Sequence, residues 1–162
     1  MKPVIRTFPA RRVVGLAAKF VSALAEGTNA QEVIPGLWHR YIGRRAEIPS
    51  TLGPVDYGVM TDLPAREKSH PAEMLYVACA EVKRGAKVPK GMTSVSIPMG
   101  RYAVFTHRGP IEQIRETIDF VYRTWLPSSK KKLRKAPHLE VYGRRFNPGS
   151  PDSEMEICLL LS

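Results

Sequence analysis

The sequence predicts a single α+β domain in which short antiparallel strands are combined with two helices. Three observations support this class. The length of 162 residues suits one domain, and 43% apolar with 25% charged residues is a globular composition. Fourteen prolines and twelve glycines divide the chain into short segments. Most of these segments have the composition of strands, and only two have apolar residues at helical spacing.

Three strands and one helix are expected in the first half of the chain. The strands are expected over Arg11 to Phe20, Val55 to Thr61 and Glu73 to Val82. Asn29 and Glu32 have the spacing of a capping box, so a helix is expected to begin there. Pro35 interrupts its apolar stripe, so either the helix kinks at Pro35 or its main part begins there.

Four strands and the second helix are expected after residue 88. The strands are expected over Thr93 to Ile97, Arg101 to His107, His138 to Arg145 and Met155 to Leu161. Gly109-Pro110 ends the second of these strands and places a proline at the first position of the helix. The apolar stripe of this helix extends from Ile111 to Trp125, and Pro127 is expected to stop it.

The two halves, about 1–84 and 88–162, resemble each other. Each is expected to run strand, helix, strand, strand, and the helices carry Trp38 and Trp125. Tyr57-Gly58 and Tyr142-Gly143 follow the two helices at matching places. We interpret the chain as a duplicated unit, although chance similarity between two such halves is the alternative. A duplication predicts a pseudo-twofold antiparallel sheet with a ligand cleft between the repeats.

The charge balance restricts the kinds of partner. Twenty-five Lys and Arg against fifteen Asp and Glu give a formal net charge of +10, which permits contact with nucleic acid. The one dense basic run is Lys130 to Lys135, and such runs are usually solvated loops. Because no recognition helix or interleaved basic and aromatic strand is present, specific nucleic-acid binding is not expected.

Other classes of protein are also disfavoured. The longest apolar run, Met74 to Ala80, is far shorter than the roughly 20 residues of a membrane-spanning helix, so no membrane association is expected. Cys79 and Cys158 have no metal-like spacing, which favours a reduced, cytoplasmic protein. We find no phosphate-cradling loop, dinucleotide fingerprint or metal motif, so no cofactor and no metal are expected.

Glu156 is the acidic residue with the greatest potential for chemistry. It lies in the expected closing strand, where alternation gives it the same face as Cys158 and Leu160. A carboxylate there faces either solvent or a cavity. If it faces an apolar cavity, its pKa should rise, and a cationic ligand would relieve the cost of its burial.

Aromatic residues form the second element of the candidate site. The five that lie at matching places in the two halves are Trp38, Tyr57, Tyr76, Trp125 and Tyr142. An aromatic wall opposite a carboxylate suits a flat, lipophilic cation. Each of these residues taken singly is more typical of a core, whereas the set as a whole favours a ligand site.

The second half resembles the gyrase-inhibitor-like (GyrI-like) small-molecule-binding family, which includes the effector-binding domains of AraC-type and MerR-type multidrug regulators. The segments that carry the resemblance are Ile97 to Pro110, Trp125 to Ser129, His138 to Tyr142 and Glu156 to Cys158. In the first half, Pro9 to Gly15, Leu37-Trp38 and the strand of Tyr76 are also similar to the family.

The resemblance implies a duplicated α+β fold with helices on one side, and it assigns the family's pocket glutamate to Glu156. It therefore predicts an effector-binding protein for a lipophilic, drug-like cation, linked to transcription regulation. One departure is that Leu159-Leu160-Leu161 lacks the proline usual in the family's last strand. Because the ligand domain uses the whole sequence, we expect a stand-alone member.

Two alternatives remain open. Some stand-alone members of the family are hydrolases of strained electrophilic compounds, and here Glu156 with Tyr142 or Tyr57 could activate water or protonate a substrate. The family also takes its name from binding DNA gyrase, so a protein partner is the second alternative.

Overall fold

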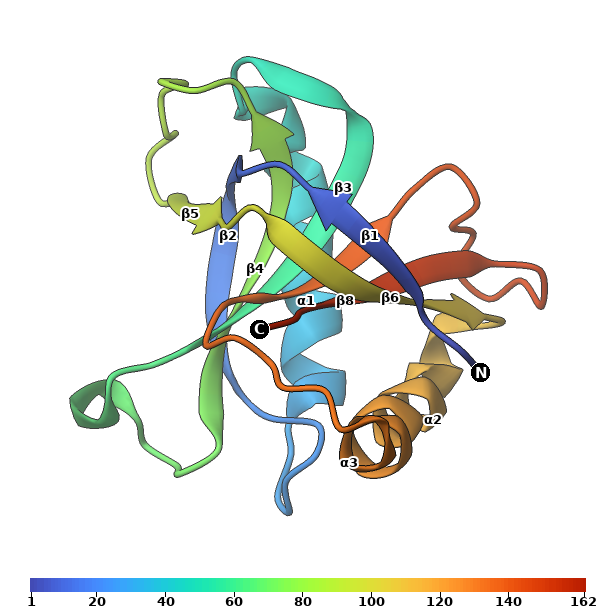
Figure 1. The fold of residues 1–162 in the computed structure, drawn as a ribbon. Helices are drawn as coiled ribbons and strands as arrows, with labels where there is room; N and C mark the ends of the chain where they lie inside the picture. Colours follow the sequence, from blue (N-terminus) through green and yellow to red (C-terminus); the bar gives the residue numbers. More distant parts are fainter.

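Eight antiparallel strands form one curled sheet with the order β1-β6-β8-β7-β3-β4-β2-β5 (Figure 1). The computed structural model describes the whole chain, Met1–Ser162. The strands are β1 Val4–Phe8, β2 Arg11–Val21, β3 Thr51–Asp62, β4 Glu73–Val82, β5 Thr93–Ile97, β6 Gly100–Arg108, β7 His138–Tyr142 and β8 Glu154–Leu160. The expected strands are all present, whereas β1 was not expected from the sequence.

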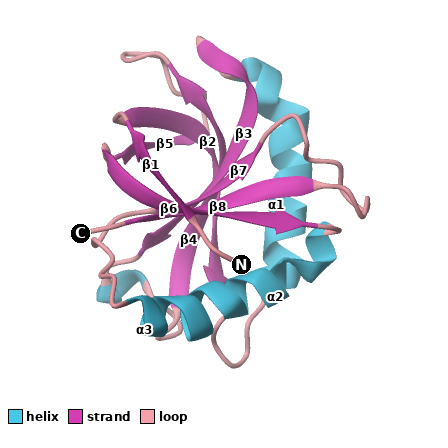
Figure 2. Ribbon diagram, turned by 45° about the vertical axis from the view of Figure 1, so that its right-hand side comes forward, coloured by secondary structure: helices cyan, strands magenta, loops and turns pink.

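Two helical segments cover the sheet (Figure 2). The first is α1, Ala30–Arg44. The second consists of α2, Ile114–Asp119, a π-helical stretch, Phe120–Trp125, and α3, Leu126–Ser129. Neither α1 nor the shorter helices combine the length and the apolar composition that a membrane-spanning helix needs. The α+β class, with an antiparallel sheet and helices on one side, is therefore confirmed.

The strand order is symmetric about the central pair β7 and β3. The counterparts in the two halves are β1 and β5, β2 and β6, β3 and β7, and β4 and β8. Exchanging every strand for its counterpart gives the same strand order, read from the opposite edge of the sheet. This arrangement is the one expected if two similar halves pair through their third strands. The origin of the halves by duplication stays a prediction.

The two edges of the sheet meet at a corner. β1 pairs with β6 up to Phe8 and Gly100, and β2 pairs with β5 from Arg11 and Ile97. The second ladder continues the register of the first. Only Pro9-Ala10 and Pro98-Met99, which lie between the two ladders, are unpaired. Proline has no N–H to donate, so the ladder breaks at this point and the chain bends. The sheet therefore curls around its inner face.

Apolar side chains form three buried clusters, one on the inner face and one beneath each helical segment. The inner-face cluster unites seven strands through residues such as Val13, Val77 and Leu139. The α1 cluster contains Leu37 and Tyr41. The α2 cluster contains Val121 and residues of β6 and β8. We call the side of the sheet that faces the helices its helix-covered face. Between the two helix clusters, the centre of that face carries the polar residues described below.

α1 begins where the sequence indicated and continues through Pro35 without a break. The capping differs from the expected box, because the side chain of Asn29 accepts a hydrogen bond from the backbone N–H of Val21 at 2.7 Å. The hydroxyl of Thr28 instead accepts from the N–H of Ala30 at 3.2 Å. The start of α1 is thus tied to the end of β2.

Pro127 does not end the second helical segment, which continues to Ser129. Proline cannot donate to the carbonyl four residues earlier, and it normally disrupts an α-helix for that reason. Here the preceding turn is π-helical, and the N–H of Leu126 bonds to Val121, five residues back. The wider turn accommodates Pro127 within the helical segment.

Candidate functional site

Three of the six predicted site residues come together on the helix-covered face. Trp38 of α1 donates its indole N–H to the hydroxyl of Tyr76 in β4 at 3.0 Å. The Trp38 ring lies edge-on to Tyr142 of β7, with ring centroids 5.0 Å apart. This aromatic group spans the two halves of the chain, as the sequence interpretation required.

Glu140 is the carboxylate of this group, and it was not among the site residues predicted from the sequence. The Tyr142 hydroxyl donates to Glu140 Oε2 at 2.9 Å. Glu140 lies in β7 and is only 7% exposed. Its carboxylate takes part in none of the nine ion pairs of the structure. A buried carboxylate without a cation is costly unless a ligand supplies one.

Gly58 makes room for this carboxylate. It pairs with Glu140 on one side and with Ala78 on the other, at the centre of the sheet. A Cβ at this position would overlap the Tyr76 hydroxyl and would come within 3.0 Å of Glu140 Oε1. The missing side chain is therefore what allows the phenol and the carboxylate to share this part of the sheet.

A second pair extends the site towards α2. The hydroxyl of Tyr122 lies 2.5 Å from His138 Nδ1, and the two rings are stacked at 5.7 Å. His138, Glu140 and Tyr142 occupy alternate positions of β7, so all three face the helices. We call Trp38, Tyr76, Tyr122, His138, Glu140 and Tyr142 the Glu140 cluster.

Burial sets the protonation of the Glu140 cluster. Desolvation raises the pKa of Glu140, and the hydrogen bonds from Tyr142 and Tyr76 oppose that shift. Desolvation followed by the charge of Glu140 holds the pKa of Tyr76 and of Tyr142 well above the usual range. Desolvation also lowers the pKa of His138. The cluster therefore holds one acidic group and no cation.

The other three predicted residues lie elsewhere. Glu156 faces the inner side of the sheet, with 31% of its side chain exposed, and pairs with Arg6 at 3.2 Å. Tyr57 is also on the inner face. Trp125 packs against Phe105 beneath α2, with ring centroids 4.9 Å apart. Glu156 therefore does not face the aromatic group of Trp38, Tyr76 and Tyr142. Glu156 and Tyr142 lie on opposite faces and cannot act as one pair.

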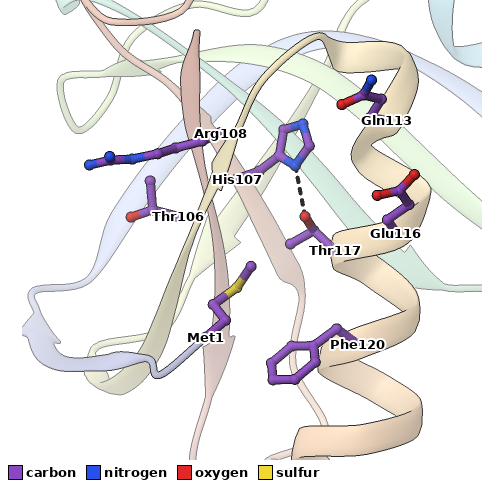
Figure 3. A pocket seen from close by; sticks show the side chains of 8 residues that line it. All are labelled: Met1, Thr106, His107, Arg108, Gln113, Glu116, Thr117 and Phe120. Atoms are coloured by element: carbon purple, nitrogen blue, oxygen red, sulfur yellow. Dashed lines mark hydrogen bonds between the residues drawn. The ribbon is translucent and has the colours of Figure 1, made fainter. Parts of the chain in front are cut away.

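Two surface cavities lie outside the Glu140 cluster. The first has a volume of about 420 Å³ and lies between β6 and α2 (Figure 3). Both ring nitrogens of its buried His107 are engaged, by Thr117 at 2.7 Å and by the Pro110 carbonyl at 3.1 Å. The second cavity, of about 150 Å³, is lined by the predicted site residue Glu156 together with Glu154, Arg144 and Arg145. Neither of these two cavities is lined by a residue of the Glu140 cluster.

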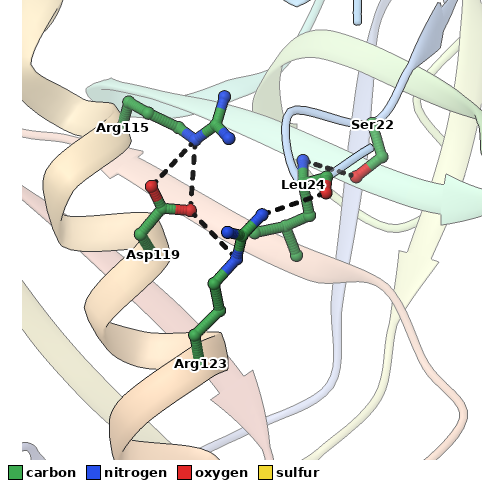
Figure 4. Close-up of polar contacts among 5 residues, drawn as sticks. All are labelled: Ser22, Leu24, Arg115, Asp119 and Arg123. Carbon is green, nitrogen blue, oxygen red and sulfur yellow. Dashed lines mark hydrogen bonds and ion pairs between the residues drawn. The ribbon is translucent and has the colours of Figure 1, made fainter. Parts of the chain in front are cut away.

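A polar contact joins the second helical segment to the loop before α1 (Figure 4). Asp119 of α2 pairs with Arg115 at 3.1 Å and with Arg123 at 3.4 Å. Arg123 also donates to the carbonyl of Leu24, in the loop before α1, at 3.2 Å. This contact connects the second helical segment to the first half of the chain.

The sequence matches one known protein family over almost its whole length. The GyrI-like small molecule binding domain matches residues 1–161. The chain belongs to this family. It is 34% identical over 157 residues to the transcriptional regulator BrlR of Pseudomonas aeruginosa, covering 96% of this chain and 56% of BrlR. It is 34% identical over 87 residues to the probable transcriptional regulator YgiV of Escherichia coli K12, covering 53% of each.

Solved structures share the fold of this GyrI-like chain. SAV2435 bound to tetraphenylphosphonium superposes with a TM-score of 0.78 at 17% identity, covering all of this chain and 94% of the other. An integron cassette protein of Vibrio cholerae has a TM-score of 0.68 at 18% identity, covering 100% and 97%. The chain spans about half the length of the curated relatives BrlR and YgiV. The chain is thus a GyrI-like small-molecule-binding domain whose relatives include transcriptional regulators.

Proposed function

We propose that this domain binds a lipophilic organic cation between α1 and α2, with Glu140 as the counter-charge. The observation that carries the proposal is a carboxylate that is buried, bordered by aromatic rings and unpaired with any cation of the chain. A bound cation would supply the missing positive charge. The tetraphenylphosphonium bound to SAV2435, which has the same fold, supports this class of ligand.

The aromatic rings suit the apolar part of such a ligand. Each favourable cation–π contact contributes about 0.5–2 kcal/mol, and burial of apolar ligand surface adds about 25 cal/mol per Å². Trp38, Tyr122 and Tyr142 are each partly exposed, so they provide the side from which a ligand enters. Because Glu140 itself is covered, entry requires the rings around it to move.

Titration with tetraphenylphosphonium tests the proposal. Binding can be followed by calorimetry and by the fluorescence of Trp38 and Trp125. Glu140→Gln keeps the shape and removes the charge, so the affinity should fall about tenfold or more. Glu156→Gln is the matched control and should change the affinity less than about twofold. Equal effects of the two substitutions, or no binding by the wild type, would refute the assignment to Glu140.

A hydrolase is the second candidate, and the hydrogen bond between Tyr142 and Glu140 favours it. A carboxyl group whose pKa is raised, held beside a phenol, has the composition of a general acid–base pair. The assay is consumption of a strained electrophile such as an epoxide. Turnover that disappears in Glu140→Gln would favour hydrolysis over simple capture.

We further propose that ligand capture serves regulation, because the relatives BrlR and YgiV are described as regulators. The protein partner considered from the family name remains a prediction. Co-purification with DNA gyrase, compared between the wild type and a charge-reversed variant of Lys130 to Lys132, would test it. Gyrase recovered in neither preparation would count against this partner.

A further inference from the structure

Arg11 holds the only two buried side-chain nitrogen or oxygen atoms of the chain that have no hydrogen-bond partner. These atoms are Nε and Nη2. Arg11 is the first residue of β2 and faces the inner side of the sheet. Buried donors without acceptors are rare in folded proteins, and a guanidinium is always charged. The two donors therefore call for an anionic acceptor.

Aromatic rings lie against the faces of the Arg11 guanidinium. Desolvation raises the pKa of Tyr57, and the charge and a hydrogen bond of Arg11 oppose that shift, while Nε and Nη2 have no partner. Its central carbon lies 4.9 Å from the centroid of the Phe8 ring and 5.3 Å from that of Tyr57. Cation–π contacts of this kind act on the flat faces. Nε and Nη2 form one in-plane edge, which is the edge that pairs with a carboxylate through two parallel hydrogen bonds.

The chain does not supply that carboxylate. Arg11 takes part in none of the nine ion pairs. Glu81 of β4 adds to the rise that desolvation causes in the pKa of Tyr57, yet it makes no ion pair with Arg11. No carboxylate of the chain pairs with the Nε and Nη2 edge, so this edge is free to bind one from a ligand.

Further positive charge lies beside the same aromatic rings. The Tyr102 ring packs on Phe8 at 5.4 Å. Desolvation raises the pKa of Tyr102, and the charges of Arg11 and Arg134 oppose that shift. Arg134 also approaches Gly100, which pairs with Phe8. Arg134 and its basic neighbours in Lys130 to Lys135 form no ion pair. This side of the inner face is thus electropositive.

We propose that the inner face holds a second binding site, which takes an aromatic carboxylate. The carboxylate accepts two hydrogen bonds from Arg11 Nε and Nη2, the ring of the ligand packs beside Phe8 and Tyr57, and Arg134 lies at the entrance. Arg11 and Phe8 are only partly buried, so the ligand enters from this side. The site lies on the opposite face of the sheet from Glu140 and does not depend on the proposed cation site.

Thermal unfolding with benzoate tests this site, and benzamide is the neutral control. Benzoate at about ten times its dissociation constant should raise the unfolding temperature of the wild type by roughly 3 °C or more. Benzamide should not raise it. Arg11→Met should abolish the response, whereas the neighbouring Arg12→Gln, which affects the other face of the same strand, should retain it.

Two further measurements separate binding from a structural role. Arg11→Met removes an unpaired charge but replaces two cation–π contacts by apolar packing, so without ligand it should unfold within about 4 °C of the wild type. Glu140→Gln and Glu81→Gln should both keep the benzoate response. The proposal is overturned if benzoate leaves the wild type unchanged, if it stabilises Arg11→Met equally, or if Glu140→Gln or Glu81→Gln removes the response. It is also overturned if Arg11→Met is strongly destabilised without ligand, since that marks a packing residue.

Discussion

Substitution of Gly58 by alanine should distort the Glu140 cluster from beneath. The added Cβ would overlap the Tyr76 hydroxyl and would lie 2.7 Å from Cζ of the same ring, well inside van der Waals contact. Tyr76 is fully buried and cannot rotate into solvent. Its ring must shift, which breaks the hydrogen bond from Trp38.

These contacts determine how much free energy of unfolding Gly58→Ala should lose. Inserting a methyl group into a packed core costs about 1–3 kcal/mol, and the lost hydrogen bond costs about 1 kcal/mol more. In a chain of this length each kcal/mol corresponds to about 2–4 °C in unfolding temperature. We therefore expect Gly58→Ala to lower the unfolding temperature by roughly 4–16 °C, as measured by circular dichroism. The affinity for tetraphenylphosphonium should fall as well.

Gly43 provides a control of opposite sign. It lies in α1, and a Cβ there would meet nothing within 4 Å. Gly43→Ala should therefore stabilise the protein by up to about 1 kcal/mol, through helix propensity alone. A Gly58→Ala variant as stable as the wild type would refute the argument that Gly58 makes room for Tyr76 and Glu140.

Three other predictions concern the same region. Because burial raises the pKa of Glu140, the wild type should lose free energy of unfolding relative to Glu140→Gln as the pH rises above about 4.5; a difference that does not change with pH in urea titrations would contradict this. Tyr41→Phe removes a 2.8 Å hydrogen bond to Asp56 and should cost about 1–3 kcal/mol in urea unfolding, so an unchanged midpoint would argue against that bond. Arg123→Gln removes the contact with Leu24 and should accelerate both association and dissociation of tetraphenylphosphonium in stopped-flow experiments, with the dissociation constant within about threefold; unchanged rates would show that this contact does not limit entry.

The sequence was sufficient for most of the fold because its elements have strong local signals. The span Glu73 to Val82 is one buried strand with the expected bounds, and α1 begins at the expected turn. β1 was not expected because its side chains are mostly exposed and it lies at an edge, so it has no clear apolar alternation. Its pairing with β6 joins segments about 100 residues apart in the sequence, which no local pattern reveals.

The candidate site was harder to predict because alternation does not identify the face that the helices cover. In β8 the residues Met155, Ile157 and Leu159 face the helix, which places Glu156 on the inner side. The helpful signal was in β7, where His138, Glu140 and Tyr142 alternate with Leu139 and Val141. Three titratable side chains on one face of a buried strand indicate a polar site, whichever face the helices cover.

The most direct test of cation binding at Glu140 is a crystal structure of the chain with tetraphenylphosphonium. We predict that the phosphonium lies between α1 and α2, beside the Glu140 carboxylate and against the rings of Trp38 and Tyr142. A phosphonium bound on the inner face near Glu156, or at the cavity beside His107, with the Glu140 cluster unchanged, would contradict it.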